Sequence, residues 1–457
     1  MQKTFSLFLL IVLVNGLFAQ KTRIQTATTT HATQLNLPWD MQWWGNEKIV
    51  FTERPGTISR LDLSNGQVDL LHSVDNVAFE TQSGLLALAL HPNWPDSNAV
   101  YAVYNYYEPN FLISTRLEKL LYDAVQDSLI PVDTLAEGIS GASTGTGARL
   151  LATADRFLYL TVGDTELGTV SQDSSSLNGK VLRWTLEGGI PNDNPIPNSP
   201  IFTFGHRNPQ GMTEGENGRI YLSEHGTFNN DEINLLEGGR NYGWPQIAGF
   251  CDASNQMACD QLNMKEPLAV WTPPIAPSGM AFYGSNVIAE WNNSLLLANL
   301  RDKSLSCLFL SPDGQQIIEQ QSYLQDSIGR IRDVLVSPDG RVFLCTSNRD
   351  SQGNPTADDD RILEVLSLGA VSIDAQSANW DLQWQWQAES LSLSFGRMLQ
   401  ENLQFELLSL EGKLTHTGQL PLGQASHRLT LPGLASGVYL LRLSSPTAST
   451  TVKLLVP

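Results

Sequence analysis

Short runs of apolar residues, many of them alternating with polar positions, recur through most of the chain and are bounded by Gly, Asn, Asp and Pro. Helical periodicity is nearly absent between Gln20 and Leu368, whereas β-branched and aromatic residues are frequent within the runs. This pattern predicts an all-β fold.

The runs come in pairs, with turn residues between the two members of each pair. The six pairs are 48–53 with 56–63, 99–107 with 113–122, 157–164 with 180–186, 219–223 with 232–236, 294–301 with 304–311, and 341–348 with 361–366. Turn signals also precede several of the runs, and two of these, at 311–314 and 337–340, have the same sequence, Ser-Pro-Asp-Gly. A repeat of roughly 50 residues that carries several short strands is typical of propeller blades. We therefore predict a six-bladed β-propeller; an ordinary multi-sheet β protein is the alternative.

In a propeller, the first strands of these pairs end on one common face, so residues just past their ends come together although they are far apart in sequence. These residues are Arg54, Asp164, His225, Arg301 and Arg349. We expect the functional site on this face.

The character of the chain changes after Leu368. Residues 369–388 are polar and typical of a linker, and residues 389–457 alternate apolar and polar positions, with a hairpin predicted at Glu411 and Gly412. A segment of about 70 residues with this pattern predicts a small C-terminal β-sandwich. It contains no charged cluster suited to catalysis.

The first 19 residues have the layout of a secretory signal peptide, with Lys3, an apolar run at 5–14 and a small residue at Ala19. The run is shorter than the roughly 20 residues that a helix needs to span a bilayer. We therefore expect cleavage after Ala19, no membrane span, a propeller at residues 20–368, and a secreted protein in the periplasm, at the cell surface or outside the cell.

The formal net charge of −19 argues against nucleic acid or an anionic membrane as a partner and fits small neutral molecules or cations. Export permits disulfides. Cys251 and Cys259 flank a short polar loop, which predicts a bridge between them. Cys307 and Cys345 lie in apolar runs, where a buried thiol and a bridge are both compatible with the pattern.

The stretch 223–245, SEHGTFNNDEINLLEGGRNYGWP, contains a His, an Asp-Glu pair and a Tyr, which are more polar and ionisable side chains than a hairpin turn requires. Calcium takes six to eight oxygen ligands from carboxylates, backbone carbonyls and water. Oxygen atoms of this kind are available at Gly226, Thr227, Asp231, Glu232 and Tyr242. The stretch is compatible with a metal-binding loop, and a polar connection capped by its own Asn and Asp side chains is the alternative.

Two further stretches present hydrogen-bonding groups on constrained backbone. In FGHRNPQGM, at 204–212, glycines and a proline hold a His, an Arg, an Asn and a Gln rigidly; a polar turn with a structural His206 is the alternative. In GRIRDVLVSPDG, Arg330 and Arg332 lie on the same side of an extended segment, where both could bind carboxylates.

Together these stretches resemble the soluble glucose/sorbosone dehydrogenase family, six-bladed propellers that oxidise aldose sugars with calcium-bound pyrroloquinoline quinone (PQQ). The resemblance covers roughly residues 37–366, in the family's order, through LPWDMQWWGNEKIVFTERPGTI, QSGLLALALHPNW, YLTVGD, GHRNPQGM, SEHGTFNNDEINLLEGGRNYGWP, IAPSGM and RIRDVLVSPDG. It implies an oxidoreductase that oxidises an aldose at the anomeric carbon by hydride transfer to the quinone and passes the electrons to an unidentified acceptor.

The resemblance also implies roles for single residues. Gly226 and Thr227 would bind calcium through backbone carbonyls, and Glu232 and Tyr242 match further calcium-ligand positions. Arg207 would lie against the quinone carbonyl and stabilise its developing negative charge. The residues expected to contact the cofactor are Gln82, Asn208, Gln210, His225, Arg301, Arg330 and Arg332.

One position departs from the family pattern. The family has a His four residues before the Arg of a Gly-Arg-Leu or Ser-Arg-Leu turn, as the base that takes the anomeric hydroxyl proton; the position four before Arg149 is Gly145. Asp164, the acid that would orient this base, is present and could accept the proton itself, directly or through a water. Loss of a positioned base typically lowers the rate roughly 10²- to 10⁴-fold. Two hypotheses stay open: a dehydrogenase with a substitute base, and a propeller that binds PQQ or a sugar without catalysis.

The last residues, GLASGVYLLRLSSPTASTTVKLLV, resemble the C-terminal sorting domain of the type IX secretion system of Bacteroidetes. The resemblance implies the type IX secretion machinery as a partner. A small carbohydrate-binding sandwich is the alternative, since a fold by itself does not fix a function.

Overall fold

The computed structural model describes residues 21, 23–370, 382–387, 390–396, 398–400, 402–409, 414–434, 437–445 and 449–456. The predicted signal peptide, residues 371–381 and 388 of the predicted linker, and the predicted turn at Glu411 and Gly412 lie outside these residues. Within the described part of the chain, no helix has both the length and the apolar character needed to cross a membrane.

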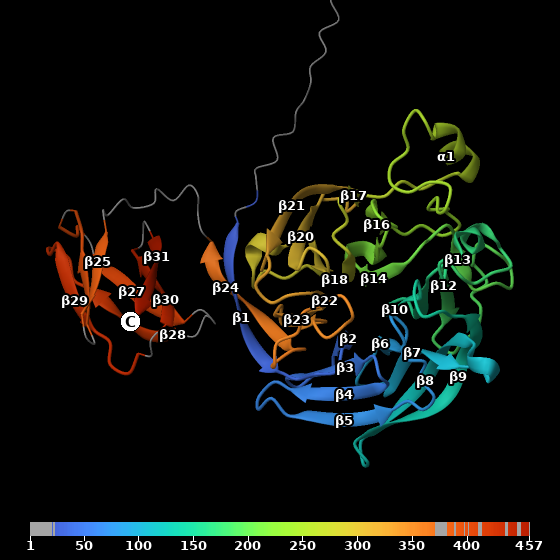
Figure 1. Ribbon diagram of the computed structural model, residues 1–457, viewed down its shortest axis with the longest axis horizontal. Helices are drawn as coiled ribbons and strands as arrows, with labels where there is room; N and C mark the ends of the chain where they lie inside the picture. Colours follow the sequence, from blue (N-terminus) through green and yellow to red (C-terminus); the bar gives the residue numbers. More distant parts are fainter. Residues whose placement is uncertain are drawn as a thin grey trace, which may run out of the picture.

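Six four-stranded antiparallel sheets form between Ile24 and Ala370, which confirms the all-β prediction (Figure 1). The first three sheets are β2 (Pro38–Trp43), β3 (Lys48–Glu53), β4 (Thr57–Asp62) and β5 (Val68–Ser73); β6 (Leu85–Leu90), β7 (Ala99–Tyr107), β8 (Ile113–Asp123) and β9 (Ser128–Ser140); and β10 (Gly147–Ala152), β11 (Phe157–Val162), β12 (Lys180–Thr185) and β13 (Ile201–Thr203).

The other three sheets follow in chain order. They are β14 (Pro209–Glu214), β15 (Ile220–Glu224), β16 (Asp231–Leu235) and β17 (Ala269–Trp271); β18 (Pro277–Tyr283), β19 (Ser294–Asn299), β20 (Ser304–Leu310) and β21 (Ile317–Tyr323); and β22 (Ile331–Val336), β23 (Val342–Thr346), β24 (Ile362–Ala370) and β1 (Ile24–Ala32). The helical elements of the described residues are short: α1 (Gln256–Leu262) and 3-10 turns at Pro109–Phe111, Gly168–Gln172, Glu216–Gly218 and Ala289–Trp291.

The six sheets are arranged around a common centre (Figure 1). The first strand of each sheet contacts the first strand of the next, and the contact between β22 and β2 closes the ring. β1 comes from the start of the described chain and pairs with β24 of the last sheet, with Thr28 opposite Val365, so the two ends of the ring meet in one sheet. This radial arrangement is propeller-like.

Each of the six predicted strand pairs is an antiparallel pair, and in every sheet it forms the second and third strands. The prediction misses the first strand of each sheet. These strands line the centre of the ring and carry polar residues such as Asp40, Arg149 and Asp333, so their hydrophobic pattern is interrupted.

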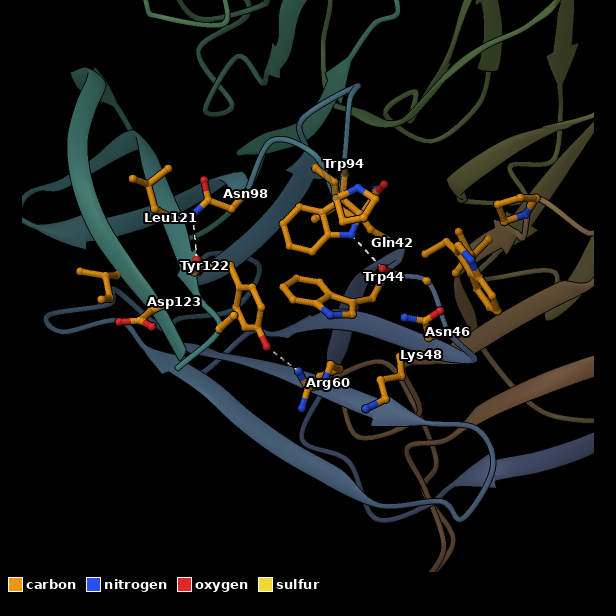
Figure 2. Close-up of a pocket in the computed structure, with 18 of the residues that line it drawn as sticks. Gln42, Trp44, Asn46, Lys48, Arg60, Trp94, Asn98, Leu121, Tyr122 and Asp123 are labelled. Carbon is orange, nitrogen blue, oxygen red and sulfur yellow. Dashed lines mark hydrogen bonds between the residues drawn. The ribbon is translucent and has the colours of Figure 1, made fainter. Parts of the chain in front are cut away.

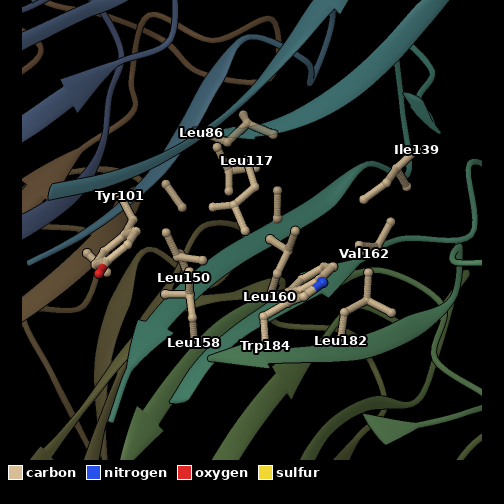
Figure 3. Close-up of a cluster of buried hydrophobic side chains, with 14 of the residues drawn as sticks. Leu86, Tyr101, Leu117, Ile139, Leu150, Leu158, Leu160, Val162, Leu182 and Trp184 are labelled. Carbon is tan, nitrogen blue, oxygen red and sulfur yellow. The ribbon is translucent and has the colours of Figure 1, made fainter. Parts of the chain in front are cut away.

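Apolar side chains fill the space between neighbouring sheets. Leu86 and Tyr101 from one sheet pack with Leu160 and Trp184 from the next (Figure 3). The Tyr101 hydroxyl donates a hydrogen bond to the Leu186 carbonyl at 3.1 Å, which satisfies its polar end within the same interface. Each such side chain contributes roughly 1.5–3 kcal/mol on full burial. This packing holds the strand ends, and the polar residues that follow them, at fixed positions.

The two Ser-Pro-Asp-Gly turns have the same structure and the same role. In each, the glycine N–H donates to the serine carbonyl, at 2.8 Å for Gly314 and 2.9 Å for Gly340. Each glycine carbonyl accepts the hydroxyl of a tyrosine from the preceding sheet, Tyr221 at 2.8 Å and Tyr283 at 3.0 Å. The repeated sequence therefore connects neighbouring sheets as well as the strands of its own sheet.

The described residues after 381 form two further sheets. One contains β25 (Gln383–Gln387), β26 (Ser390–Ser394) and β29 (Ser426–Thr430), and the other contains β28 (Leu414–Leu420), β27 (Leu403–Ser409), β30 (Gly437–Ser444) and β31 (Ser449–Val456). Leu393, Leu407 and Leu441 belong to one hydrophobic core shared by both sheets. Because β24 reaches Ala370 and β25 begins at Gln383, strand structure extends into both ends of the segment predicted as a linker.

Candidate functional site

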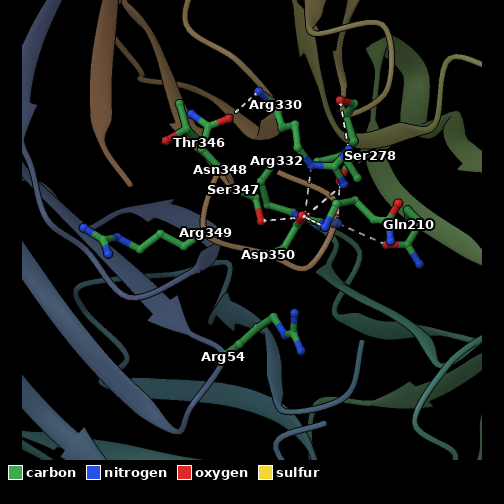
Figure 4. Close-up of polar contacts among 12 residues, drawn as sticks. Arg54, Gln210, Ser278, Arg330, Arg332, Thr346, Ser347, Asn348, Arg349 and Asp350 are labelled. Atoms are coloured by element: carbon green, nitrogen blue, oxygen red, sulfur yellow. Dashed lines mark hydrogen bonds and ion pairs between the residues drawn. The ribbon is translucent and has the colours of Figure 1, made fainter. Parts of the chain in front are cut away.

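Two arginines at the start of β22 contact one carboxylate. Arg330 Nη2 lies 2.9 Å and Arg332 Nη2 lies 3.7 Å from Asp350 Oδ2 (Figure 4). Arg332 Nη1 also lies 3.2 Å from Ser278 Oγ and 3.4 Å from Gln210 Oε1. The two side chains thus lie on the same side of the segment, as their spacing predicts.

Positive charge exceeds negative charge around this pair. The guanidinium of Arg332 lies over the indole of Trp39, with Cζ 3.8 Å from the ring centroid, and Arg54 lies 5.4 Å from the same ring. Arg54 donates to backbone carbonyls in 80–83 and not to a carboxylate. Burial lowers the pKa of Arg332 to about 9; the shared aspartate opposes this effect, and Arg330 and Arg54 add to it. Since the buried Nε atom of Arg332 has no hydrogen-bond partner in the described part of the chain, the cluster has both charge and a donor available for an anion.

Amide side chains extend from this cluster to the start of β10. Gln210 Nε2 donates to Asn208 Oδ1 at 3.0 Å, and the same oxygen accepts the Gly147 N–H at 3.0 Å. Gln82 Oε1 accepts the Gly145 N–H at 3.1 Å. The structure therefore brings Gln82 and the Asn208–Gln210 segment to the same turn, at Gly145 and Gly147, although the three segments are far apart in the sequence.

Two of the predicted site residues lie outside these contacts. Arg349 donates to the backbone carbonyls of Asp359 and Ala357, so its guanidinium stabilises the loop that contains them. Arg301 is exposed, and its backbone N–H donates to the Ile275 carbonyl. Since Arg330 Nη1 donates to the carbonyl of Leu300, the backbone before Arg301 is nevertheless adjacent to the arginine pair.

His206 and Glu224 form a buried support beneath the segment before β14. Glu224 Oε2 lies 2.9 Å from His206 Nδ1, and Thr203 Oγ1 lies 2.9 Å from His206 Nε2. The imidazole stacks on the Tyr242 ring at 4.6 Å between centroids. Both ring nitrogens of His206 are thus used by the fold, which favours the structural interpretation of this residue.

Arg207 connects this support with the neighbouring loops. Its backbone N–H donates to Glu224 Oε1 at 2.5 Å, and its Nη1 donates to the Gly226 carbonyl at 2.6 Å. Its Nη2 lies 3.1 Å from Glu166 Oε2, and its Cζ lies 5.6 Å from the centroid of the Trp244 ring. The guanidinium is thereby fixed beside Gly226, a predicted calcium ligand.

Asp164 is buried, and both of its carboxylate oxygens already accept hydrogen bonds. Oδ1 accepts the Glu166 N–H at 2.9 Å and Oδ2 accepts the Trp244 Nε1–H at 2.8 Å. Burial raises the pKa of Asp164. A Cβ atom built on Gly145 would lie 3.4 Å from Asp164 Oδ1, so Asp164 adjoins the position where the family has its histidine.

His225 presents an unpaired nitrogen. Its Nε2 atom is buried and has no hydrogen-bond partner among the described residues. Burial, together with the positive charges of Arg332 and Arg207, lowers the pKa of His225 to about 3. The imidazole is therefore neutral at physiological pH, and its free nitrogen can hydrogen-bond to a ligand.

The predicted metal loop places carboxylates around a small cavity. Glu224, Gly226, Glu232 and Tyr242 line a cavity of about 10 Å³, which is the volume of about one water-sized sphere. Glu232 accepts the Gly249 N–H at 2.6 Å. Burial, reinforced by the charge of Glu224, raises the pKa of Glu232 to about 8. A cation in the cavity would relieve this repulsion.

Other oxygen atoms of the loop are used by the fold. The Asp231 carboxylate accepts the N–H groups of Gly226 at 2.9 Å and Ala276 at 2.7 Å, and the Tyr242 hydroxyl donates to the Leu235 carbonyl at 2.8 Å. Thr227 is exposed. In the described part of the chain no group of three or more His, Cys, Asp or Glu side chains is arranged to bind a metal. A cation here would therefore depend on backbone carbonyls and water in addition to Glu232.

Several neighbours of the site were not predicted. They are Trp39, Glu166, Glu224, Trp244 and Asp350. Glu166 lies two residues after the YLTVGD motif, and Trp244 lies within the 223–245 motif. Only their contacts with Arg207 and Asp164 show that they belong to the site. Asp350 follows a predicted strand end directly, and its position in the chain gave no indication of its contact with two arginines.

A groove of about 1380 Å³ lies at the other end of the ring, and Figure 2 shows residues that line it. Trp44, Trp94 and Tyr122 line it; the rings of Trp44 and Trp94 lie 4.1 Å apart and those of Trp44 and Tyr122 lie 4.9 Å apart. Val336 also lines it and ends β22, the strand that begins next to Arg330. The groove is thus on the face opposite the arginine cluster.

The two cationic groups of this groove each lie close to a carboxylate. Arg60 binds Asp127 through two hydrogen bonds of 2.7 Å, and Lys48 lies 3.5 Å from Asp62. Since the unpaired polar atoms described above gather at the opposite end of the ring, size alone does not identify the functional site.

Comparison with known proteins identifies the family of this chain. Residues 35–355 match the sequence model of a family described as Glucose / Sorbosone dehydrogenase, and residues 387–457 match one described as Secretion system C-terminal sorting domain. The aldose sugar dehydrogenase YliI of Escherichia coli is 29% identical, over 76% of this chain and 96% of the relative. Quinoprotein glucose dehydrogenase B of Acinetobacter calcoaceticus is 29% identical, over 73% and 87%.

Solved structures agree with these relatives. The PQQ-bound form of aldose sugar dehydrogenase from Streptomyces coelicolor is 32% identical, with a TM-score of 0.66, over 76% of this chain and 99% of its own. The family match at residues 35–355 lies within the six-sheet region and includes the segments that carry the arginine cluster.

Proposed function

Since the chain belongs to the glucose/sorbosone dehydrogenase family of oxidoreductases, we propose that it oxidises an aldose sugar at the anomeric carbon with PQQ as cofactor and calcium as the bound ion. The observation that carries the proposal is the excess of positive charge at the buried Arg54 and Arg332 and the half-buried Arg330, which Asp350 balances only in part. A quinone with three carboxylates supplies the missing anions, and guanidinium groups suit carboxylates because they present paired donors.

The residues around the cluster fit such a cofactor. Among the described residues, neither Arg332 Nε nor His225 Nε2 has a hydrogen-bond partner, so both atoms can hydrogen-bond to a ligand. Asn208, Gln210 and Gln82 supply amide groups in the same region. Arg330 is half-buried and Arg301 is exposed, and both would add positive charge to the site.

Calcium would lie at the 10 Å³ cavity beside Glu232. Gly226 is required in this loop, because a Cβ there would lie 1.9 Å from the Asn229 carbonyl oxygen. The Gly226 carbonyl accepts from Arg207, and its second lone pair can face a cation. The Thr227 and Tyr242 carbonyls would complete the protein ligands, with water in the other positions.

Bound PQQ supplies the two-electron oxidant for the sugar. Arg207 would hold its guanidinium beside the metal and stabilise negative charge as the electrons arrive, because a buried positive charge acts strongly where water is excluded. Asp164 and Trp244 fix the adjacent wall of the site through their 2.8 Å hydrogen bond. The substitution of Gly145 for the family's histidine favours one alternative function, a propeller that binds PQQ or a sugar without turnover.

We further propose that each of the six sheets is one blade of a propeller that occupies residues 20–368. Residues 1–19 would be a cleaved signal peptide and residues 369–388 a linker. Residues 389–457 would form a sandwich that directs export through the type IX machinery, which the sorting-domain match at residues 387–457 supports.

A titration of the mature protein with PQQ, with and without calcium, tests the proposal. We expect saturable, calcium-dependent binding. Addition of an aldose should then reduce the quinone, which is observed as a change in its absorbance. Binding without reduction by any aldose would favour the binding-protein alternative. If PQQ does not bind in the presence of calcium, both functions are wrong.

A further inference from the structure

The space beside Gly145 is occupied by the side chain of Glu166. A Cβ atom built on Gly145 would lie 3.2 Å from Glu166 Oε1 and 3.0 Å from the Glu166 backbone nitrogen. The missing histidine and Glu166 therefore compete for the same place. Since a glycine leaves this place free, the carboxylate of Glu166 can enter it.

The backbone of the turn at residues 164–167 holds Glu166 beside Gly145. Thr165 and Glu166 have φ angles of +54° and +62°, which residues other than glycine and asparagine rarely adopt. The turn is held by the Thr165 N–H to the Gly145 carbonyl at 3.0 Å, the Glu166 N–H to Asp164 Oδ1 at 2.9 Å, and the Leu167 N–H to the Asp164 carbonyl at 2.9 Å. Strained backbone of this kind persists where the surrounding structure enforces it, and it is frequent at functional sites.

Glu166 is better placed than Asp164 to accept a proton from a substrate. Both oxygens of Asp164 accept hydrogen bonds from the protein, and its side chain is buried. The Glu166 side chain is 50% exposed; Oε2 lies 3.1 Å from Arg207 Nη2, and Oε1 has no hydrogen bond among the described residues. The ion pair with Arg207 orients the carboxylate and leaves one oxygen open to the site.

We propose that Glu166 is the catalytic base of this dehydrogenase, in place of the histidine that the chain lacks. The inference rests on the proposed function. In the step, the anomeric hydroxyl of the aldose gives its proton to Glu166 Oε1. The hydrogen on the anomeric carbon leaves with its electron pair to the quinone, so the sugar is oxidised to the lactone while the quinone is reduced. Asp164 acts as a positioning residue, because it holds the Glu166 backbone.

The contact between Glu166 and Arg207 supports the assignment of Glu166 as the base. Arg207 is the group proposed to stabilise the negative charge that develops on the oxidant, and it lies within 3.1 Å of the proposed base. Proton acceptor and charge stabiliser are thus adjacent, as a reaction requires when a proton and an electron pair leave the same carbon–oxygen unit.

The test compares Glu166→Ala, Glu166→Gln and Glu166→Asp with a matched control. Glu137→Gln is the control, because Glu137 Oε2 pairs with Arg116 Nη2 at 3.0 Å on an exposed surface away from the site. The Ala and Gln variants are expected to lose roughly 10²- to 10⁴-fold in turnover, with PQQ affinity within a few-fold of wild type. Added formate should restore part of the activity of Glu166→Ala and none of Glu166→Gln, since only the smaller side chain leaves room for a carboxylate.

A second measurement uses the apoprotein and needs no turnover. Gly145→His should lower the unfolding temperature more in the wild-type background than in Glu166→Ala, since the two side chains compete for one space. Equal effects in both backgrounds would contradict the proposed placement. In the double variant, the new imidazole should also raise turnover above that of Glu166→Ala.

The outcomes separate this inference from the proposed function. If the wild-type protein reduces PQQ with an aldose and Glu166→Gln does so at the same rate, Glu166 is not the base while the function holds. If the wild-type protein binds PQQ but no aldose reduces it, the proposed function is wrong, and the assignment of Glu166 as the base is wrong with it.

Discussion

The guanidinium of Arg149 lies 3.0 Å from the carboxylate of Asp40, and both side chains are buried at the centre of the ring. Arg149 Nη1 also lies 3.1 Å from Asp333 Oδ1, and Arg149 Nε donates to the Gln210 carbonyl at 3.1 Å. One side chain thus connects β10 with β2, β14 and β22 across the centre. The arginine that marks the family's catalytic motif in the sequence is therefore also a structural element of the ring.

Replacing Arg149 by Met should strongly destabilise the protein, because two buried carboxylates would lose their partner. Breaking a buried ion pair by removing one partner typically costs about 3–5 kcal/mol. Urea unfolding should show this loss. Lys303→Met is the control, since Lys303 pairs with Asp326 at 3.4 Å on the exposed surface and should change stability by about 1 kcal/mol or less. Similar effects of the two variants would contradict the structural role of Arg149.

The same cluster predicts a pH dependence of stability. Burial raises the pKa of Asp333 to about 7 from the ordinary value of 3.8, with Arg149 opposing this shift and Asp40 adding to it. The folded protein therefore retains a proton that the unfolded chain releases. This contribution to stability is complete below about pH 4 and is lost as the pH rises to about 7. Unfolding temperatures measured between pH 4 and 8 should fall less steeply for Asp333→Asn than for wild type; parallel curves would disprove the assignment.

The arginine cluster should dominate the affinity for PQQ. Arg332→Met should raise the dissociation constant by roughly 30- to 4000-fold, since truncating one partner of a buried charge pair costs about 2–5 kcal/mol. Arg332→Lys should recover only part of the loss, because an ammonium lacks the planar paired donors of a guanidinium. Fluorescence titration of the apoprotein measures both, with Arg116→Met on the distant surface as control. Unchanged binding by Arg332→Met would place the cofactor elsewhere.

Calcium should stabilise the protein through Glu232. A ligand at 100 times its dissociation constant stabilises the folded state by about 2.7 kcal/mol. The rise in unfolding temperature on addition of calcium should be lost in Glu232→Gln, which keeps the shape of the side chain and removes its charge. Glu216→Gln, at an exposed position of a 3-10 turn, should leave the rise unchanged. A full calcium response in Glu232→Gln would remove this residue from the site.

The cysteines should react in a fixed order. Cys251 and Cys259 are joined by a disulfide, which confirms the predicted pair, while Cys307 and Cys345 are free and buried. Burial raises the pKa of both free thiols, so each is protonated and shielded from reagents. Thiol titration of the native protein should detect almost no reaction, unfolding should expose two thiols, and reduction should add two more. Reaction of a thiol in the native state would contradict this burial.

The strand pairs could be read from the sequence because the second and third strands of each sheet are short, continuous apolar runs bounded by turn residues. The first strands escaped prediction, since their inward positions hold Asp40, Arg149 and Asp333, whose charges are compensated only across the ring. Long motifs also identified the arginine pair and the loop with Glu232, because these groups lie close to one another in the chain.

The sequence by itself determined the all-β character, the bridge between Cys251 and Cys259, and the absence of a histidine four residues before Arg149, because each depends on residue type and on local spacing. Only the tertiary structure decided which of the two carboxylates beside Gly145 is open to a substrate. Asp164 and Glu166 are two residues apart and equal in charge, but the turn buries one and directs the other to Arg207. The burial and the partners of each carboxylate depend on contacts between segments that are distant in the chain, and these contacts cannot be predicted from local sequence.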